Sequence, residues 1–292
     1  MPSASTYSRP SSLDEALTLI QSTSGKALKI LAGGTDLLIQ MRAGLYPDTT
    51  LLDIKNIPET MAITIEPNQI RIGAAVPAAE ICANAQLQQL YPGLVEGIEY
   101  IGSTQIQSRA TFGGNLCNAS PAADGVPALI AAGGTCLIIG PEGRRINPIS
   151  TICTGPGKTS LGQGEFIAEF ILPMPKPGSA DAYLRFTPRN EMDIAVVGVA
   201  ANLSVDADGT CTHAQVVIGA IAPTALVASD VATCLIGQPL TPEIIDKAGE
   251  IASQLGSPLT DKRGTSEYRH QIAGVLTKRA IKIAAERAKK AH

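Results

Sequence analysis

The sequence predicts an α+β protein of two domains, and three observations support this prediction. The chain has 292 residues, enough for two compact domains at a scale of roughly 150 residues each. Strand-like and helix-like segments alternate as far as Leu172, whereas three long strand candidates and then two helices follow later in the chain. Between these parts, PMPKPGS holds three prolines and a glycine, a composition typical of a linker. We therefore expect one domain at 1–176 and a second at 177–292.

Local patterns define the elements of the first domain. Ser12 and Glu15 have the spacing of a capping box, which predicts a helix over LDEALTLIQ. Apolar runs predict strands at LKIL, TTLLDI and EFIAEFIL, and alternation on both sides of Pro67-Asn68 and of Glu142-Gly143 predicts two hairpins. Further helices are expected at 36–44, 77–90 and 94–101.

The second domain is predicted to be an antiparallel meander followed by helices. AYLRFTPR, DIAVVGVAANLSV and HAQVVIGAI are successive strand candidates. Thr241-Pro242-Glu243 supplies an N-cap, a first-turn proline and an acid, and a second helix is expected from about Ser266 to Lys290. Strands followed by helices are typical of an α+β domain.

Composition excludes several classes of function. The net charge is −3, aromatic residues make up 3% and tryptophan is absent, which argues against a nucleic-acid-binding surface. No apolar run approaches the ~18 residues of a membrane span, and MPSASTYSRP lacks the hydrophobic segment of a secretory signal. Six widely spaced cysteines without CxxC and three histidines predict reduced thiols and no metal or iron–sulfur site. We expect a cytoplasmic protein.

Two glycine-rich segments are the candidates for chemistry: the first glycine loop (Leu31–Leu38, LAGGTDLL) and the second glycine loop (Ala110–Asp124, ATFGGNLCNASPAAD). Paired glycines let backbone N–H groups approach an anion closely, and a helix N-terminus adds partial positive charge. Either loop alone is equally consistent with a turn or a helix cap. Together, each followed by small polar residues, they predict a clamp for a pyrophosphate.

Two other nucleotide-binding templates do not fit. No GxGxxG occurs, so a Rossmann fingerprint is missing. Gly155–Thr159 resembles the end of a P-loop, but Ile152 occupies the position of the required glycine. Pro156 also removes an amide that would hold phosphate. We therefore predict a surface turn for this segment.

Five segments resemble, in order, the flavin-binding medium subunit of molybdenum hydroxylases, the relatives of xanthine dehydrogenase and carbon monoxide dehydrogenase. They are AGGTDLL, IRIGAAV, QIQSRATFGGNLCNASPAAD, RNEMDIAVVGVA and RGTSEYRHQIAGVLTKRA. The second glycine loop is the most specific of them. The resemblance implies a two-lobed FAD-binding domain of the vanillyl-alcohol-oxidase-like (PCMH) type at 1–176, with lobes at about 1–56 and 57–176. An α+β C-terminal flavoprotein domain would follow at 177–292.

The resemblance also implies a cofactor site, in which backbone amides of both glycine loops hold the pyrophosphate of FAD. The implied cofactor-binding residues are Leu31, Ala32, Gly33, Gly34, Thr35, Asp36, Leu37, Thr111, Phe112, Gly113, Gly114, Asn115, Ser120, Asp124 and Ile194. Two positions depart from the family. Ile194 stands where carbon monoxide members have a tyrosine over the flavin, and Val196 where animal xanthine dehydrogenases have a lysine.

Some of these residues have a second interpretation. Asp124 is also placed to be the N-terminal acid of a helix over GVPALIAA, and Ser120 to bond the backbone of its own loop. Ile194 also fits a strand residue facing the core, and Cys117 fits a buried thiol better than a flavin neighbour. Three side chains on one strand region are candidates to face a partner subunit: Tyr183, Arg185 and Arg189.

The function implied by the resemblance is electron transfer through FAD. Electrons would come from a molybdenum site through [2Fe-2S] clusters of a small subunit and leave to an external acceptor: NAD, a quinone, a protein or oxygen. The implied partners are that small subunit and a large molybdenum-cofactor subunit, as a dimer of heterotrimers. No catalytic acid, base or nucleophile is assigned to this chain. A stand-alone FAD oxidoreductase and a cofactor-free assembly subunit are the alternatives.

Overall fold

The N-terminal lobe is built on a small parallel sheet. The computed structural model of the chain describes residues 6–23 and 27–291. The elements of this lobe are β1 (Thr6–Ser8), α1 (Leu13–Ser22), β2 (Ala27–Leu31), α2 (Leu37–Arg42) and β3 (Thr49–Asp53). Strands β1 and β2 both pair in parallel with β3. The predicted capping box is confirmed, because the Ser12 side chain accepts a hydrogen bond from the Glu15 N–H.

The second lobe combines an antiparallel sheet with short helices. The sheet order is β4-β5-β10-β6-β7, so the hairpins predicted at Pro67-Asn68 and Glu142-Gly143 are confirmed as β4–β5 and β6–β7. The elements are η1 (Ile54–Asn56), α3 (Pro58–Met61), β4 (Ile63–Ile65), β5 (Gln69–Gly73), α4 (Ala78–Ala83), α5 (Ala85–Leu90), α6 (Pro92–Glu99), α7 (Thr104–Gln107), α8 (Phe112–Cys117), α9 (Gly125–Ala131), β6 (Thr135–Gly140), β7 (Gly143–Pro148), η2 (Ile149–Thr151), β8 (Cys153–Gly155), β9 (Lys158–Thr159) and β10 (Phe166–Pro173).

Two local details of this lobe differ from the prediction. The helix expected over 77–90 is divided into α4 and α5, because Asn84 has an extended backbone and its side chain caps α5. The second glycine loop is not an open loop throughout. It contains α8, which begins after Thr111, whose hydroxyl accepts from the Gly114 N–H at 2.9 Å.

The C-terminal domain confirms the predicted meander. Its elements are β11 (Ser179–Phe186), β12 (Val197–Val205), β13 (Cys211–Gly219), β14 (Leu226–Val227), α10 (Ser229–Leu235), α11 (Pro242–Ala252) and α12 (Ser266–Lys290). The strands are antiparallel in chain order, and Thr241 caps α11 as predicted. Helix α10 was not predicted; it is only seven residues long. In residues 6–23 and 27–291, no helix has the length and apolar character that crossing a bilayer requires.

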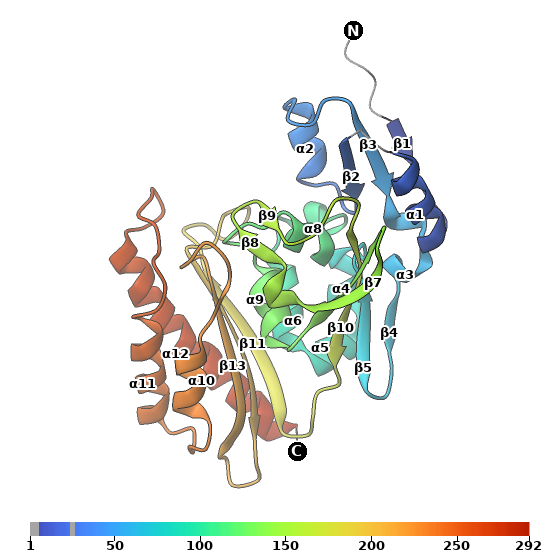
Figure 1. Ribbon diagram of the computed structural model, residues 1–292. Coiled ribbons are helices and arrows are strands. Elements are labelled where there is room, and N and C mark those ends of the chain that lie inside the picture. Colours follow the sequence, from blue (N-terminus) through green and yellow to red (C-terminus); the bar gives the residue numbers. More distant parts are fainter. Residues whose placement is uncertain (1–5, 24–26, 292) are drawn as a thin grey trace.

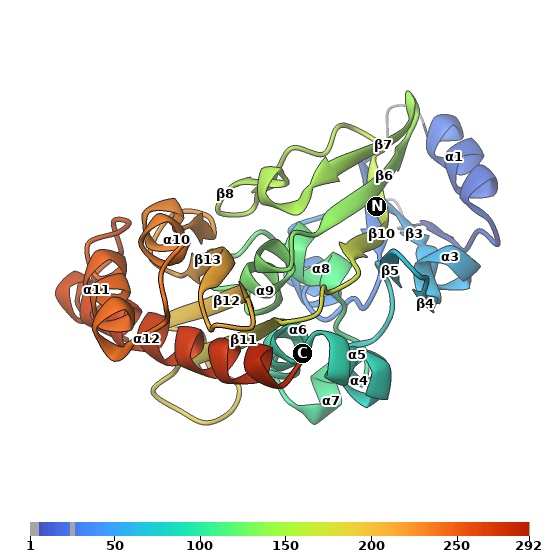
Figure 2. The same cartoon turned by 90° about the horizontal axis from the view of Figure 1, so that it is seen from below.

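Helices cover both faces of the C-terminal sheet. Helices α10 and α12 contact its outer face and α11 packs on both of them, while α6 and α9 of the first domain contact β11, β12 and β13 from the inner side. Tyr183, Ala200 and Val217 of this sheet are buried in the same core as the helices of the second lobe. In Figure 1 the N-terminal lobe and the C-terminal helices lie at opposite ends of the molecule, and Figure 2 shows α12 running along the sheet toward α6. The two domains therefore share a hydrophobic core.

A buried carboxylate fixes α6 to the C-terminal sheet. Asp181 of β11 is 4% exposed and accepts hydrogen bonds from the Gly93 and Leu94 N–H groups at 2.8 and 2.9 Å. Burial raises the pKa of Asp181 to about 7, although both N–H donors favour the ionised form. Farther along α6, Glu96 pairs with Arg287 of α12. Polar contacts thus reinforce the apolar packing between the domains.

We expect Asp181→Ala to lower the free energy of unfolding by about 2–4 kcal/mol, because two buried N–H groups at the start of α6 lose their acceptor. Urea denaturation followed by circular dichroism measures the change. The matched control is Asp246→Ala, which removes an exposed pair with Lys278 and should change the free energy by less than about 1 kcal/mol. Equal, small effects in both variants would contradict the assigned role of Asp181.

Candidate cofactor-binding site

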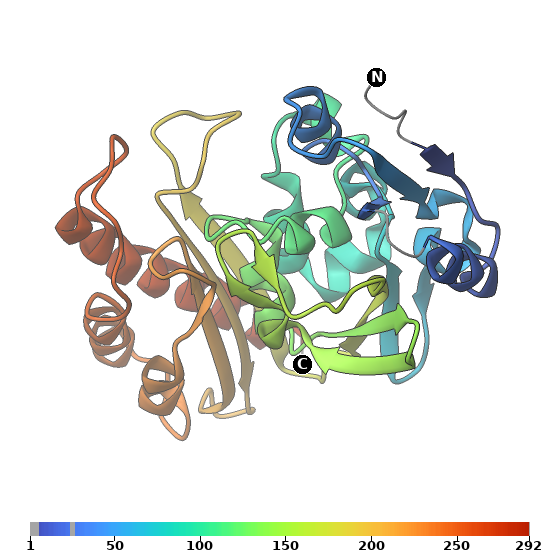
Figure 3. The same ribbon diagram turned by 45° about the horizontal axis from the view of Figure 1, so that its top comes forward.

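A cavity of about 390 Å³ lies between the two lobes. The N-terminal lobe contributes β2, the first glycine loop and α2, and the second lobe contributes the second glycine loop and residues 157–167. Figure 3 shows the region between the blue N-terminal lobe and the yellow-to-red C-terminal domain, where the green elements of the second lobe lie. Ten of the residues expected at the cofactor line this cavity: Ala32, Gly33, Gly34, Thr35, Asp36, Leu37, Thr111, Gly113, Gly114 and Asn115.

The first glycine loop presents unpaired backbone donors to the cavity wall. Within the described part of the chain, none of the N–H groups of residues 33–36 donates a hydrogen bond. The Asp36 side chain does not cap α2 either. A run of N–H groups without acceptors at the start of a helix is suited to binding an anion. The geometry of this segment therefore supports the predicted pyrophosphate clamp on one side.

Glycine is required in this loop for two different reasons. A Cβ added at Gly33 would lie 1.9 Å from the Arg109 carbonyl oxygen, so Gly33 lets the first loop pack directly on the start of the second. Gly34 has a φ of +77°, which side-chain-bearing residues rarely adopt. At the other end of the two loops, Gln40 Nε2 reaches Asn118 Oδ1 at 3.5 Å. The backbone of the first loop is thus held against the second.

The second glycine loop contributes differently, because most of its amides already have acceptors. The Gly113 N–H donates to the Ala74 carbonyl, and the Gly114 N–H donates to the Thr111 hydroxyl. An added Cβ at Gly113 would meet the Ala74 carbonyl oxygen at 2.5 Å, whereas at Gly114 it would meet only Thr111 Oγ1, at 3.2 Å. Gly113 is therefore a packing glycine. At Gly114 the close neighbour is a single side-chain oxygen, and this residue lines the cavity.

Five of the expected residues do not line the cavity, and four of them have the following surroundings. Leu31 is buried, and Phe112 lies in the core with its ring edge-on to Phe170. Ser120 accepts from the Ala122 N–H at 3.3 Å, which confirms that it bonds its own loop. Ile194 is 52% exposed on the loop that joins β11 to β12, so the alternative that it faces the core is wrong.

The fifth, Asp124, belongs to a buried ion pair between the domains. Its carboxylate accepts from the Tyr183 hydroxyl and from Arg185 Nη1, both at 2.8 Å, and Arg185 also lies over the Tyr100 ring. Asp124 does stand at the N-terminal cap position of α9, as the alternative predicted, but its side chain makes no capping bond there. Tyr183 and Arg185 are buried, which corrects the expectation that they face a partner. Burial raises the pKa of Asp124 to about 6, opposed by the Arg185 charge.

The pair lies close to the cavity but outside its lining. Asn115, which lines the cavity, accepts through Oδ1 from the N–H of Gly125, the residue after Asp124. Arg185 lies over the ring of Tyr100, and the next residue in the chain, Ile101, also lines the cavity. The ion pair of Asp124 and Arg185 is therefore one residue removed from groups that contact or line the cavity.

Sequence reasoning missed several residues of the cavity. The segment Gly155–Thr159 is a turn as predicted, between β8 and β9, but Gly157 and Thr159 also line the cavity. Lys29 Nζ lies 4.1 Å from the centre of the Tyr46 ring at the β2 side. Cys117 is exposed and lines the cavity, so the preferred interpretation as a buried thiol is wrong. The second glycine loop already contains Cys117, whereas no local motif signals Lys29, Gly157 or Thr159 as cavity residues, because they reach the cavity only in the fold.

The raised pKa of Asp124 makes stability depend on pH. An exposed aspartate has a pKa of about 3.9, so between pH of about 4 and 6 the folded chain binds more protons at this group than the unfolded chain. Stability contributed by this group therefore falls as pH rises through that window. The quantity to follow is the difference in the free energy of unfolding between the wild type and Asp124→Asn. We expect this difference to decrease by up to about 3 kcal/mol between pH of about 4 and 6.5. Urea denaturation across this range measures it, and a constant difference would show that the pKa is not raised.

Comparisons with known proteins agree with this geometry. Residues 3–175 match the family described as the FAD binding domain in molybdopterin dehydrogenase, and residues 182–284 match the CO dehydrogenase flavoprotein C-terminal domain. The carbon monoxide dehydrogenase medium chain of Afipia carboxidovorans is 31% identical, with 99% of each chain covered. The putative xanthine dehydrogenase FAD-binding subunit of Escherichia coli is 30% identical, with 94% of each chain covered.

Solved structures give the same result. Carbon monoxide dehydrogenase from Hydrogenophaga pseudoflava matches with a TM-score of 0.91 at 30% identity, covering 98% of this chain and 99% of that one. Quinoline 2-oxidoreductase from Pseudomonas putida matches with a TM-score of 0.88 at 26% identity, with 99% of each chain covered. The family matches span both domains, and the paired glycine loops lie at the cavity between the lobes. The chain belongs to the family of FAD-binding medium subunits of the molybdenum hydroxylases.

Proposed function

We propose that the chain binds FAD in the cavity between its lobes and is the electron-transfer subunit of a molybdenum-containing hydroxylase. In this role it accepts electrons from [2Fe-2S] clusters of a small partner subunit and passes them to an external acceptor. A large subunit with the molybdenum cofactor is the second partner, in a cytoplasmic dimer of heterotrimers. The observation that carries the proposal is the row of N–H groups at residues 33–36 that have no acceptor in the described chain.

The residues around the cavity fit the parts of FAD. The unpaired amides of the first glycine loop match the negative charge of a pyrophosphate, and Lys29 adds a cation on the same side. Apolar side chains for a ring system come from the opposite lobe, among them Ile101 and Leu161. The second glycine loop forms the facing wall, where Gly114 lines the cavity.

In this proposal the protein binds and orients the cofactor, and the redox chemistry is the cofactor's own. Bound FAD supplies a group that accepts two electrons and can also exchange them one at a time. The chain's residues hold the pyrophosphate, cover the ring system and set the charge nearby through Asp124 and Arg185. Among the described residues, no group of three His, Cys, Asp or Glu side chains is arranged for a metal ion.

A size series at Gly114 tests the site. Gly114→Ala brings a Cβ to 3.2 Å from Thr111 Oγ1, and Gly114→Val adds two methyl groups at the cavity wall. We therefore expect little change for alanine and at least a tenfold weaker FAD affinity for valine, on the order of 1.4 kcal/mol. Gly114 lies in α8, and glycine is a poorer helix former than alanine. The melting temperature of cofactor-free Gly114→Ala should therefore not fall below that of the cofactor-free wild type. Titration of cofactor-free chain with FAD, followed by flavin fluorescence, measures the affinity.

A substitution at Gly33 would not test FAD binding alone, although the first glycine loop supplies the unpaired N–H groups. A side chain there would collide with the Arg109 carbonyl oxygen, so Gly33→Val disrupts the packing of the loops whether or not FAD binds. Full FAD affinity in Gly114→Val would count against the cavity as the site.

The isolated chain separates the proposed function from the two alternatives. We expect the purified chain to show the two-banded visible spectrum of a flavin and to release FAD on heating. We expect its flavin to be reduced by dithionite but not by xanthine or carbon monoxide, because substrate oxidation belongs to another subunit. Reduction by such a substrate would favour a stand-alone oxidoreductase. A colourless chain that takes up no added FAD would favour an assembly subunit.

A further inference from the structure

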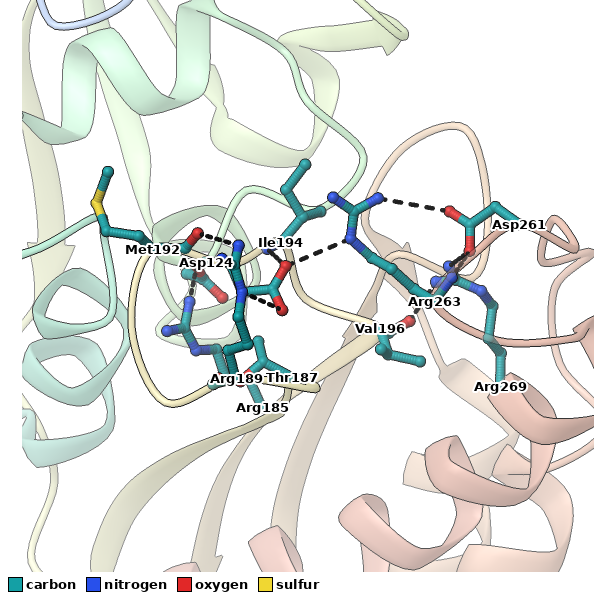
Figure 4. Close-up of polar contacts among 11 residues, drawn as sticks. Asp124, Arg185, Thr187, Arg189, Met192, Ile194, Val196, Asp261, Arg263 and Arg269 are labelled. Atoms are coloured by element: carbon teal, nitrogen blue, oxygen red, sulfur yellow. Dashed lines mark hydrogen bonds and ion pairs between the residues drawn. The ribbon is translucent and has the colours of Figure 1, made fainter.

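The loop between β11 and β12 is fixed at three points although its most apolar side chains are exposed. Met192 and Ile194 are 56% and 52% exposed. The Met192 N–H donates to the Gly102 carbonyl at 3.4 Å, which ties the loop to the second lobe beside the cavity residue Ile101. Two arginines of the C-terminal domain hold its other end, as Figure 4 shows.

The first of these arginines is Arg263. Its Nε lies 3.5 Å from Asp193 Oδ1 and its Nη1 lies 3.8 Å from Asp261 Oδ2, so one guanidinium joins two carboxylates on different loops. The Asp193 side chain is only 6% exposed and also accepts from the Ile194 N–H at 2.8 Å. Arg189, which is largely exposed, pairs with the other oxygen of Asp193 at 3.5 Å. The backbone at Ile194 is therefore attached to Arg263 through a single carboxylate.

The second arginine, Arg269, secures the end of the same segment. Its Nη1 donates to the Val196 carbonyl at 2.6 Å, and its Nη2 pairs with Asp261 at 2.7 Å. The guanidinium is 6% exposed and cannot leave without an unpaired buried charge. Asp261 is thus shared by Arg263 and Arg269, and the ion network holds residues 193–196 from both sides.

Ile194 is exposed, yet the ion network fixes the backbone that carries it. This arrangement suits a side chain that contacts a bound ligand. In Figure 4 the Ile194 side chain points away from strands β11 and β12 and from the ion network below it. The side chain gains nothing from the core in this position. Contact with an apolar ring bound at the cavity between the lobes would remove part of the side chain from water.

We propose that Arg263 is a positioning residue: by pairing with Asp193 it holds residues 193–196 so that Ile194 contacts the flavin of bound FAD. The inference rests on the proposed function, because it needs FAD at the cavity. Arg263 itself touches neither the cavity nor a reacting group. Its effect passes through Asp193 and the backbone to Ile194.

Hydrogen exchange tests whether Arg263 fixes residues 193–196, and it can be measured with or without FAD. In Arg263→Gln, we expect amides 193–196 to exchange about fivefold faster, as for the loss of one partly buried ion pair. Arg263→Lys should restore part of the protection, since an ammonium keeps the charge but cannot span both carboxylates. Asp246→Asn, which breaks an exposed pair of the same domain, is the control and should leave this exchange unchanged. Unchanged exchange in Arg263→Gln would overturn the proposal.

The effect on the cofactor is tested by iodide quenching of flavin fluorescence in the FAD-loaded chain. We expect the quenching constant to rise at least twofold in Ile194→Ala and in Arg263→Gln, and to rise no further in the double variant, because both changes remove the same contact. Additive increases, or none, would show that Arg263 does not act through Ile194. The visible spectrum of each preparation reports FAD content separately. A wild-type chain without FAD would overturn the proposed function, whereas a loaded chain without the quenching effect overturns this inference alone.

Discussion

Strand β11 is the element on which the arrangement of the two domains depends. Along one strand, Asp181 accepts the first N–H groups of α6, and Tyr183 and Arg185 both bond the carboxylate of Asp124 at the start of α9. The side chains of this ion pair are less than a tenth exposed, so separating the domains would leave charges without partners in a dry environment. The apolar core that spans the same interface adds the larger share of the packing energy.

This docking determines where the site is formed. The second glycine loop contains α8 and ends at α9, the helix that packs on the C-terminal sheet, while the first loop packs on its start through Gly33. The loop that follows β11 then carries Ile194 back toward the second lobe. The residues that line the cavity belong to the two lobes, and the loop after β11 is tied to the second lobe beside one of them, Ile101.

Much of the fold was accessible from local patterns. Ser12 and Thr241 were predicted as N-caps because a capping oxygen and the N–H groups that it bonds lie within three residues. Both hairpins and the meander followed from alternating apolar residues. The failures were short elements: Asn84 ends one helix and caps the next, and α10 has only seven residues. In such cases tertiary contacts outweigh propensity, which is weak over so few residues.

The sequence by itself determined the elements, their order and the paired glycine loops, because turns, caps and close backbone approach depend on neighbouring residues. It also carried the family resemblance and hence the expectation of FAD. Only the tertiary structure decided that Asp124 pairs with Arg185, that the turn at Gly157 reaches the cavity wall and that Arg263 holds Asp193. These partners are tens of residues apart in the chain. Their pairing follows from burial in the assembled domains, and no local pattern encodes it.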